Sequence, residues 1–460
     1  MARGPRRGAS LLCGGRRCYS VRVRALDCPA RLRTLAAALL VAAPLAVASS
    51  GCASACKRVA ADRQAFLQRE ASASAPQLLL ALPLAPLSQE LTRRLSRVKP
   101  VRVPLPELGI GGVDLPLGSL SARLHSIILL PAAPEHLAFR ARVNLSAGNQ
   151  TVTTIDLEAE FRPRLDVANG VVDVAVTPAD IARVRPTIPA SERKRLGDFL
   201  YGQVPAMARR FVNRQAVDGL VERLADDLLG GSWPLIRDNL LGDVGTLTEF
   251  SIDLPELPLA AIGLRSTDAD LLLAITSDLP AAGLTSLARD PNTPATLPQL
   301  RISGSAVAEL VNWQMAEGAI PGRYTREGVA SPRGTFEAGA TWEPGQRPLK
   351  LHVWDSTKEC AYVQFGGTPR VSVGGGELAV AVNDATIEES KGSAKVRAAL
   401  WFRRLGHQTF AVSESTAANV RFELFGAQMR ATATSASLTN DILTLGLTLI
   451  EERPAARQSR

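Results

Sequence analysis

The chain has 460 residues, enough for two or three domains, with a formal net charge of +9 and a pI near 9.6. The excess charge is confined to residues 1–34, which hold nine arginines and one acid, Asp27, and so carry eight of the nine net charges. The nearly neutral remainder lacks the electrostatic footprint of a protein that binds DNA or RNA.

Residues 1–51 are predicted to be a targeting segment. An apolar run, residues 35–48, follows basic residues, has the length of a signal-peptide core and is too short to span a bilayer. The small residues before Cys52 resemble a bacterial lipobox, which implies that Cys52 is lipidated and becomes the mature N-terminus. The alternative is an ordinary secretory signal cleaved between Ala48 and Gly51.

The six cysteines fit this interpretation. Cys13, Cys18 and Cys28 leave with the signal segment. If Cys52 is acylated, Cys56 and Cys360 remain and can pair in an oxidising compartment, although the sequence does not show whether they are close. No cysteine spacing of the metal-binding kind is present.

The next elements open the body of the chain. Residues 53–76 are small and polar and predict a tether with at most one short helical turn. Residues 77–84 predict a short strand, and residues 88–98 predict an amphipathic helix that Pro100 ends.

Long alternating strands follow. Residues 137–145 alternate apolar and polar side chains, and residues 153–167 place only apolar side chains on one face and only charged ones on the other. Asn169-Gly170 is a hairpin signal. These patterns predict an antiparallel sheet with one apolar face.

A long helix is predicted next. Apolar residues recur at helical spacing from Leu196 to Leu228, with a kink at Pro205 and a stop at Gly230-Gly231. Residues 299–303 then predict another short strand and residues 304–318 another helix. Because further strands fill residues 335–450, the order strand, helix, long strands occurs twice.

The second strand and helix carry a family resemblance. The stretch ISGSAVAELVNWQMAEG resembles the opening of the second barrel in the tubular lipid-binding (TULIP) superfamily, of the bactericidal/permeability-increasing protein type. The matching positions are Ser303, Val307, Leu310, Asn312, Trp313 and Gly318. A looser similarity, at residues 81–95, lies at the opening of the first barrel. The family's disulfide in the first barrel has no counterpart, since no cysteine lies between residues 57 and 359.

The resemblance implies an α+β fold of two tandem barrel-like units, each a long curved antiparallel sheet wrapped around a long helix. The implied domains are a first barrel at residues 76–262, central strands and a linker at 263–300, and a second barrel at 301–455, after the signal at 1–51 and a lipidated tether at 52–75. It further implies an apolar tube that receives acyl chains, lined by Phe139, Val143, Ile155, Leu157, Phe161, Leu200, Val204, Met207, Phe211, Leu310 and Trp313. Packing of a closed core is the alternative for each of these side chains.

Catalytic patterns are not found in the sequence. The four histidines have no metal-ligand spacing, and there is no GxSxG nucleophile elbow. His352, on a predicted strand, is expected to be a hydrogen-bonded, outward-facing residue. We therefore expect no enzyme activity, no cofactor and no metal.

The expected function is non-catalytic binding or transfer of lipids, either phospholipid or fatty acid, by a lipoprotein of the bacterial cell envelope. The lipid anchor would attach it to the outer membrane, facing the periplasm or the surface. The alternative is a structural or adhesion lipoprotein with a filled core that binds another envelope protein.

Overall fold

A computed structural model describes most of the chain after the signal segment, all of it within the unit Cys52–Arg460. The described residues are 54–70, 75–104, 108–110, 113–115, 118–168, 171–175, 184–204, 214–230, 233–234, 236–238, 250–253, 258–318, 320–355, 360–374, 377–391, 409–412, 419–424 and 427–452. The predicted signal core at 35–48 and the candidate lipidation site Cys52 lie outside them.

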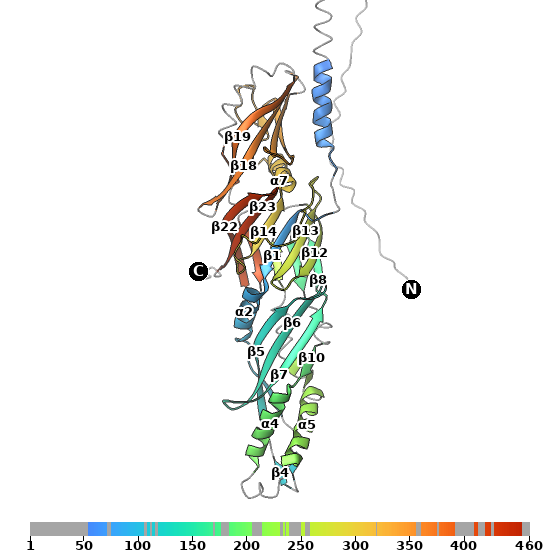
Figure 1. Cartoon of the computed structure of the whole chain (residues 1–460), viewed down its shortest axis with the longest axis vertical. Helices are drawn as coiled ribbons and strands as arrows, with labels where there is room; N and C mark the ends of the chain where they lie inside the picture. The colour runs from blue at the N-terminus through green and yellow to red at the C-terminus, as the bar shows by residue number, and fades with distance from the viewer. Residues whose placement is uncertain are drawn as a thin grey trace, which may run out of the picture. The chain divides into compact units, whose positions relative to one another are not determined.

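The described chain is α+β, with antiparallel pairing between all its strand neighbours, as the alternating patterns predicted (Figure 1). A ten-stranded sheet, called the central sheet below, contains strands from both ends of the chain. Its order is β12 (Leu259–Ser266), β13 (Asp270–Ser277), β1 (Leu78–Pro83), β14 (Gln299–Ser303), β23 (Ile442–Glu451), β22 (Ala427–Thr439), β21 (Asn419–Leu424), β11 (Phe250–Asp253), β9 (Val171–Ala175) and β8 (Arg164–Ala168). The arrangement into two barrels stays a prediction.

A five-stranded sheet, the N-terminal sheet, holds the long alternating strands. Its order is β10 (Arg185–Thr187), β7 (Gln150–Phe161), β6 (Leu137–Ala147), β5 (Ser119–Leu130) and β2 (Val101–Pro104), and β3 (Leu108–Ile110) pairs separately with β4 (Val113–Leu115). Figure 1 shows β5, β6 and β7 side by side and curved. On β6 the odd-numbered residues from Leu137 to Leu145 are buried, while Arg140 and Arg142 face solvent. The period-two pattern thus gives one apolar and one charged face.

A six-stranded sheet, the C-terminal sheet, contains most of the strands predicted after residue 335. Its order is β15 (Arg323–Tyr324), β16 (Phe336–Trp342), β17 (Leu349–Asp355), β18 (Ala361–Gly374), β19 (Glu377–Lys391) and β20 (Thr409–Val412). Gly374 pairs with Glu377, the last described residue of β18 with the first of β19, and residues 375–376 lie outside the described set.

Two helices use polar side chains to hydrogen-bond the unpaired backbone edges of long strands. Helix α2 (Leu84–Leu95) follows β1 and lies along β5 where β2 ends. Its Thr92 hydroxyl bonds the N–H and carbonyl of Ile127, both at 3.1 Å, and its Ser88 hydroxyl accepts from the N–H of Leu129 at 2.9 Å. These bonds pair backbone groups that would otherwise end a sheet unsatisfied.

Helix α7 (Gly304–Glu317), which follows β14, makes the same kind of hydrogen bond to a strand edge. The Asn312 side chain donates to the carbonyl of Ala340 at 2.8 Å and accepts from its N–H at 2.6 Å, beyond the part of β16 that β15 covers. Ser303 caps the helix by accepting from the N–H of Ala306, and Gly318 ends it at a φ of 81°. Because β1 and β14 are neighbours, the two strand–helix units start side by side.

The single long helix predicted from Leu196 to Leu228 is wrong, because the structure has two helices in this region. Helix α4 (Ala190–Gln203) and helix α5 (Arg214–Gly230) pack against each other, and Arg193 forms an ion pair with Glu222 at 2.7 Å. Val204, just before Pro205, has an extended backbone with ψ 126°. A residue before proline is pushed out of the helical region, so the helix ends there instead of bending.

The single strand predicted at 153–167 is also divided. It forms β7 in the N-terminal sheet and β8 in the central sheet, and the break falls at Arg162 and Pro163. Proline has no N–H to donate to a ladder, and here it separates pairing with β6 from pairing with β9. Ala168 pairs with Val171, as the predicted two-residue hairpin at Asn169-Gly170 requires, although those two residues lie outside the described set.

Residues 54–67, expected to belong to a tether, form a helix instead. It is bound to the C-terminal sheet by the contacts described below. None of the described helices combines the length and apolar character needed to cross a bilayer.

Candidate functional site

The candidate lipid-binding residues converge on one apolar cluster. Phe139 and Val143 of β6 and Ile155 and Leu157 of β7 point to the same face of the N-terminal sheet and are at most 7% exposed. Leu200 of α4 belongs to the same cluster at 2% exposure. Five of the residues proposed from sequence therefore lie together in the interior.

The other candidates have different positions. Val204, at the end of α4, is 2% exposed, whereas Leu310 and Trp313 of α7 are half-buried and pack against the same cluster. Met207 and Phe211 lie outside the described residues, and for Phe161 only the backbone, the last residue of β7, is described.

The cluster is continuous and aliphatic. It joins buried side chains of β1, β5, β6, β7, β13, β14 and β23 with those of α2, α4 and α5. Among its buried members in the described part of the chain, Phe139 and Trp233 are the only aromatic residues. Leucine, isoleucine, valine and alanine supply the rest, so the interior resembles hydrocarbon in its chemistry.

The opposite face of the N-terminal sheet is charged and internally paired. Arg140 and Glu158, directly opposite on β6 and β7, are 2.7 Å apart, and Arg142 and Asp156 are 2.9 Å apart. Exposed pairs of this kind contribute about 0–1 kcal/mol each. Their main effect is to keep this face of the sheet solvated while the other is dry.

A second cluster, which the sequence did not reveal, binds the helix at residues 54–67. Cys56 forms a disulfide with Cys360, which answers the question of their pairing. Asp62 pairs with Lys391 at 2.8 Å and Arg63 pairs with Glu337, so ion pairs reach β19 and β16 from adjacent helix positions. The side chains at 56, 59, 63 and 66 have the 3-4-3 spacing of one helix face, a signal present in the sequence but without a visible partner.

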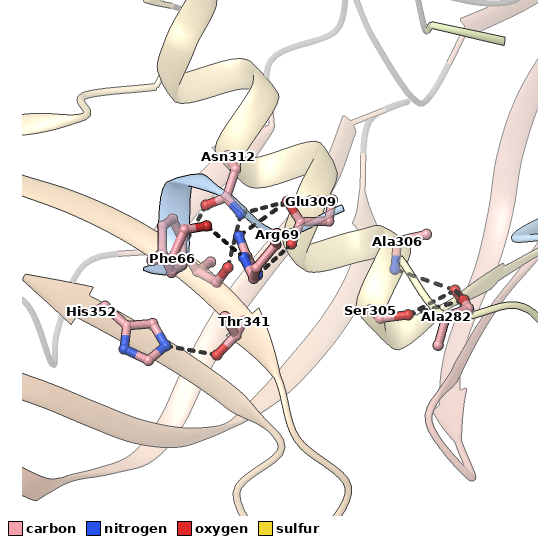
Figure 2. A network of polar contacts seen from close by, with 11 residues as sticks. Phe66, Arg69, Ala282, Ser305, Ala306, Glu309, Asn312, Thr341 and His352 are labelled. Atoms are coloured by element: carbon pink, nitrogen blue, oxygen red, sulfur yellow. Dashed lines mark hydrogen bonds and ion pairs between the residues drawn. The ribbon is translucent and has the colours of Figure 1, made fainter. Parts of the chain in front are cut away.

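The end of this helix lies beside α7 and β17. Phe66 packs 4.7 Å from the Trp354 ring and 5.5 Å from the His352 ring, measured between centroids. Arg69 forms a 2.7 Å ion pair with Glu309, which also accepts from Asn312 at 2.9 Å, as Figure 2 shows. The helix is therefore held at its start by a covalent bond and just beyond its end by an ion pair.

His352 is not the outward-facing residue that was expected. It is 8% exposed, because the helix at 54–67 covers this face of the sheet, but it is hydrogen-bonded as expected. Its Nε2 lies 2.7 Å from the Thr341 hydroxyl, and its Nδ1 lies 2.9 Å from the Tyr362 hydroxyl.

Burial changes the acidity of several groups here. Desolvation, aided by the cations Arg69 and Lys350, lowers the pKa of His352 to about 4. Burial raises the pKa of Glu309, opposed by its hydrogen bond from Asn312 and by Arg69, and burial also raises the pKa of Tyr362. His352 is thus a neutral partner of two hydroxyls at neutral pH, in a packed setting rather than an open one.

Metal-binding geometry is not seen in the part of the chain that the structure describes. There, no group of three or more histidine, cysteine, aspartate or glutamate side chains is arranged to hold a metal ion.

The chain matches no known protein family and no curated protein. Its fold has distant similarity to solved structures. P47 from Clostridium botulinum A2 is 8% identical, with a TM-score of 0.37 over 83% of this chain and 99% of P47. P47 from Clostridium botulinum E1 is 9% identical, with a TM-score of 0.36 over 81% and 99%. A lipopolysaccharide binding protein is 10% identical, with a TM-score of 0.26 over 83% and 100%. These are weak similarities of fold.

Proposed function

We propose that this protein is a non-catalytic lipid-binding or lipid-transfer lipoprotein of the bacterial envelope that holds acyl chains in its apolar interior. In this proposal the two strand–helix units open two tandem barrels. Cys52 carries the lipid anchor at the outer membrane, and phospholipid or fatty acid is the ligand.

The observation that supports this proposal is the continuous aliphatic cluster beneath the N-terminal sheet. Burying a methylene group contributes about 0.8 kcal/mol, so a sixteen-carbon chain gains on the order of 10 kcal/mol before the cost of ordering it. An interior of aliphatic side chains can supply that energy without any catalytic group. The charged outer face of the sheet keeps the same strands in water.

Native mass spectrometry of the protein produced from the full-length sequence tests the proposal. We expect a mass excess that organic extraction removes and that is identified as an acyl lipid. Uptake of a fluorescent fatty acid by the extracted protein is expected to follow.

A folded protein that carries no lipid and takes up no fatty acid would overturn the proposal. That result would favour the alternative, a filled core in a structural or adhesion lipoprotein that binds an envelope protein. Turnover of ester or glycoside substrates would overturn its non-catalytic part.

A further inference from the structure

A pocket of about 350 Å³ lies on the outer side of the N-terminal sheet, away from the network around His352. Its lining residues come from the end of α2 and from β5 and β6: Ser96, Arg123, Leu124, His125 and Asn144. Arg123 and Asn144 are directly opposite each other on the two strands, so their side chains leave the sheet on the same face.

A β-bulge shapes this pocket. The pairing of β5 with β6 shifts between Leu124 and Ser126, so His125 is the extra residue. A bulge re-aims the side chains around it and is often found beside binding sites. His125, two positions after Arg123 and exposed like it, lines the pocket at this bulge.

The polar lining is suited to an anion. The Arg123 guanidinium, the His125 ring and the Asn144 amide all offer N–H donors, and no carboxylate lines the pocket. Arg123 makes one long hydrogen bond, 3.4 Å from Nη2 to the carbonyl of Ser96, which leaves donors of its fork for a ligand. The Oδ1 atom of Asn144 lies 3.5 Å from the Thr154 hydroxyl, so its amino group is the part left for the pocket.

The surroundings add positive charge. Arg97, Lys99 and Arg102 are exposed near the end of α2 and on β2, and Arg102 pairs with Ser121, two positions before Arg123 on the same face. Within the described residues, none of these three cations nor Arg123 forms an ion pair. By contrast, Arg142, farther along the same sheet, is neutralised by Asp156.

We infer that this pocket binds the phosphate group of a phosphate ester. A guanidinium fork with flanking N–H donors matches phosphate oxygens, and charge-assisted hydrogen bonds are the stronger kind. The volume is about ten times that of one water molecule in the liquid, which leaves room for the ester substituent. The inference does not depend on acyl chains being held in the interior.

Two sources offer this chemistry, a soluble phosphate ester and a lipid headgroup. Calorimetric titration of the full-length protein with glycerol 3-phosphate tests binding itself. Arg123→Gln is expected to weaken it about tenfold, the loss of one charge-assisted contact. Arg140→Gln, which removes the same charge from the same sheet at a position already paired with Glu158, is the matched control and is expected to change it less than about twofold.

Sedimentation with vesicles then separates the sources. Binding to phosphatidylglycerol vesicles but not to phosphatidylcholine vesicles, with competition by glycerol 3-phosphate, assigns a lipid headgroup. Binding of glycerol 3-phosphate without vesicle binding assigns a soluble ester. The inference is overturned if the wild type binds neither probe, or if Arg123→Gln and Arg140→Gln weaken binding equally.

Discussion

Cys56 and Cys360 are joined by a disulfide although 304 positions separate them in the sequence. The bond attaches the first described helix to the start of β18. The helix at 54–67 is therefore covalently attached to the C-terminal sheet, and loss of this attachment should lower the stability of the protein.

Replacing both cysteines by serine should lower the free energy of unfolding by about 2–5 kcal/mol, because a cross-link over a long loop restricts the unfolded chain. Denaturant titration of the wild type and of Cys56→Ser/Cys360→Ser measures the difference. The wild type under reducing conditions is the control and should match the variant. Identical unfolding midpoints in oxidised wild type and variant would contradict the expected role of the bond.

Phe66→Ala should release the helix at 54–67 locally, because the ring packs on Trp354 and His352. We expect a stability loss of about 1–3 kcal/mol for a half-buried aromatic side chain, and faster hydrogen exchange in residues 54–67. Leu67→Ala is the matched control, since Leu67 is 58% exposed and its truncation should change neither quantity. Equal effects of the two variants would mean that Phe66 does not hold the helix.

Stability should fall when the pH is lowered from about 6.5 to about 4, and His352 should cause part of this change. Burial lowers the pKa of His352 from 6.5 to about 4. Between these values the unfolded chain binds a proton that the folded chain does not, so folding is opposed as the pH falls. The contribution is at most about 3 kcal/mol.

Denaturant titrations of the wild type and of His352→Gln across this pH range test the point. The variant should show a smaller pH slope, whatever its stability at neutral pH. His125→Gln, at an exposed position, controls for the loss of one imidazole elsewhere in the chain. Parallel slopes in the wild type and His352→Gln would contradict the assignment.

Phe139→Ala separates an interior that holds acyl chains from one that is filled by side chains. In a filled core the truncation costs about 3–5 kcal/mol. With lipid bound we expect a loss below about 2 kcal/mol and an unchanged or higher lipid content, since an acyl chain can occupy the space. Leu79→Ala, in a small separate cluster with Ala81 and Leu272, is the control and should cost about 2–5 kcal/mol. A full core penalty at Phe139 with no bound lipid would favour the filled core.

Cys52→Ala should abolish the attachment of a fatty acid and move the protein from the membrane fraction to the soluble one. Incorporation of labelled palmitate followed by fractionation measures both. Cys56→Ser is the matched control, because Cys56 is engaged with Cys360 and is expected to have no part in acylation. Label retained in Cys52→Ala would mean that another residue is acylated, and absence of label from the wild type would mean that the segment is an ordinary secretory signal.

Local signals predicted much of the fold. Alternation predicted β6 and most of β7, and the helix predicted at residues 304–318 matches α7 to within a residue. Two of the errors occurred at Pro163 and Pro205, where a proline ended an element that the apolar pattern continued. Hydrophobic periodicity predicts which side chains share a face of a strand. It does not predict where the chain leaves one sheet for another, as it does between β7 and β8.

The candidate sites were harder to predict, because they depend on contacts between segments that are far apart in the sequence. The apolar face of β6 and β7 follows from period two alone, so Val143, Ile155 and Leu157 could be placed in the interior. The burial of His352 could not be foreseen, because the residues that cover it come from a segment of small polar composition almost 300 positions earlier. The proposed phosphate pocket adjoins a bulge at His125, and a pattern of alternating residues does not predict such a register shift.

The position of β1 governs the order in which the chain can fold. Leu78 lies between Ile275 on one side and Ile302 on the other, so both neighbours of the first strand are made about 200 residues later. Contacts of such high sequence separation are slow to form, because the loop between them must be closed first. A chain shortened to residue 262 would leave β1 with two unpaired edges, which can pair with strands of other chains and cause aggregation. We therefore expect the two halves of this protein to be poorly soluble when expressed as separate fragments. The nascent chain is expected to stay incompletely folded until β14 has been synthesised.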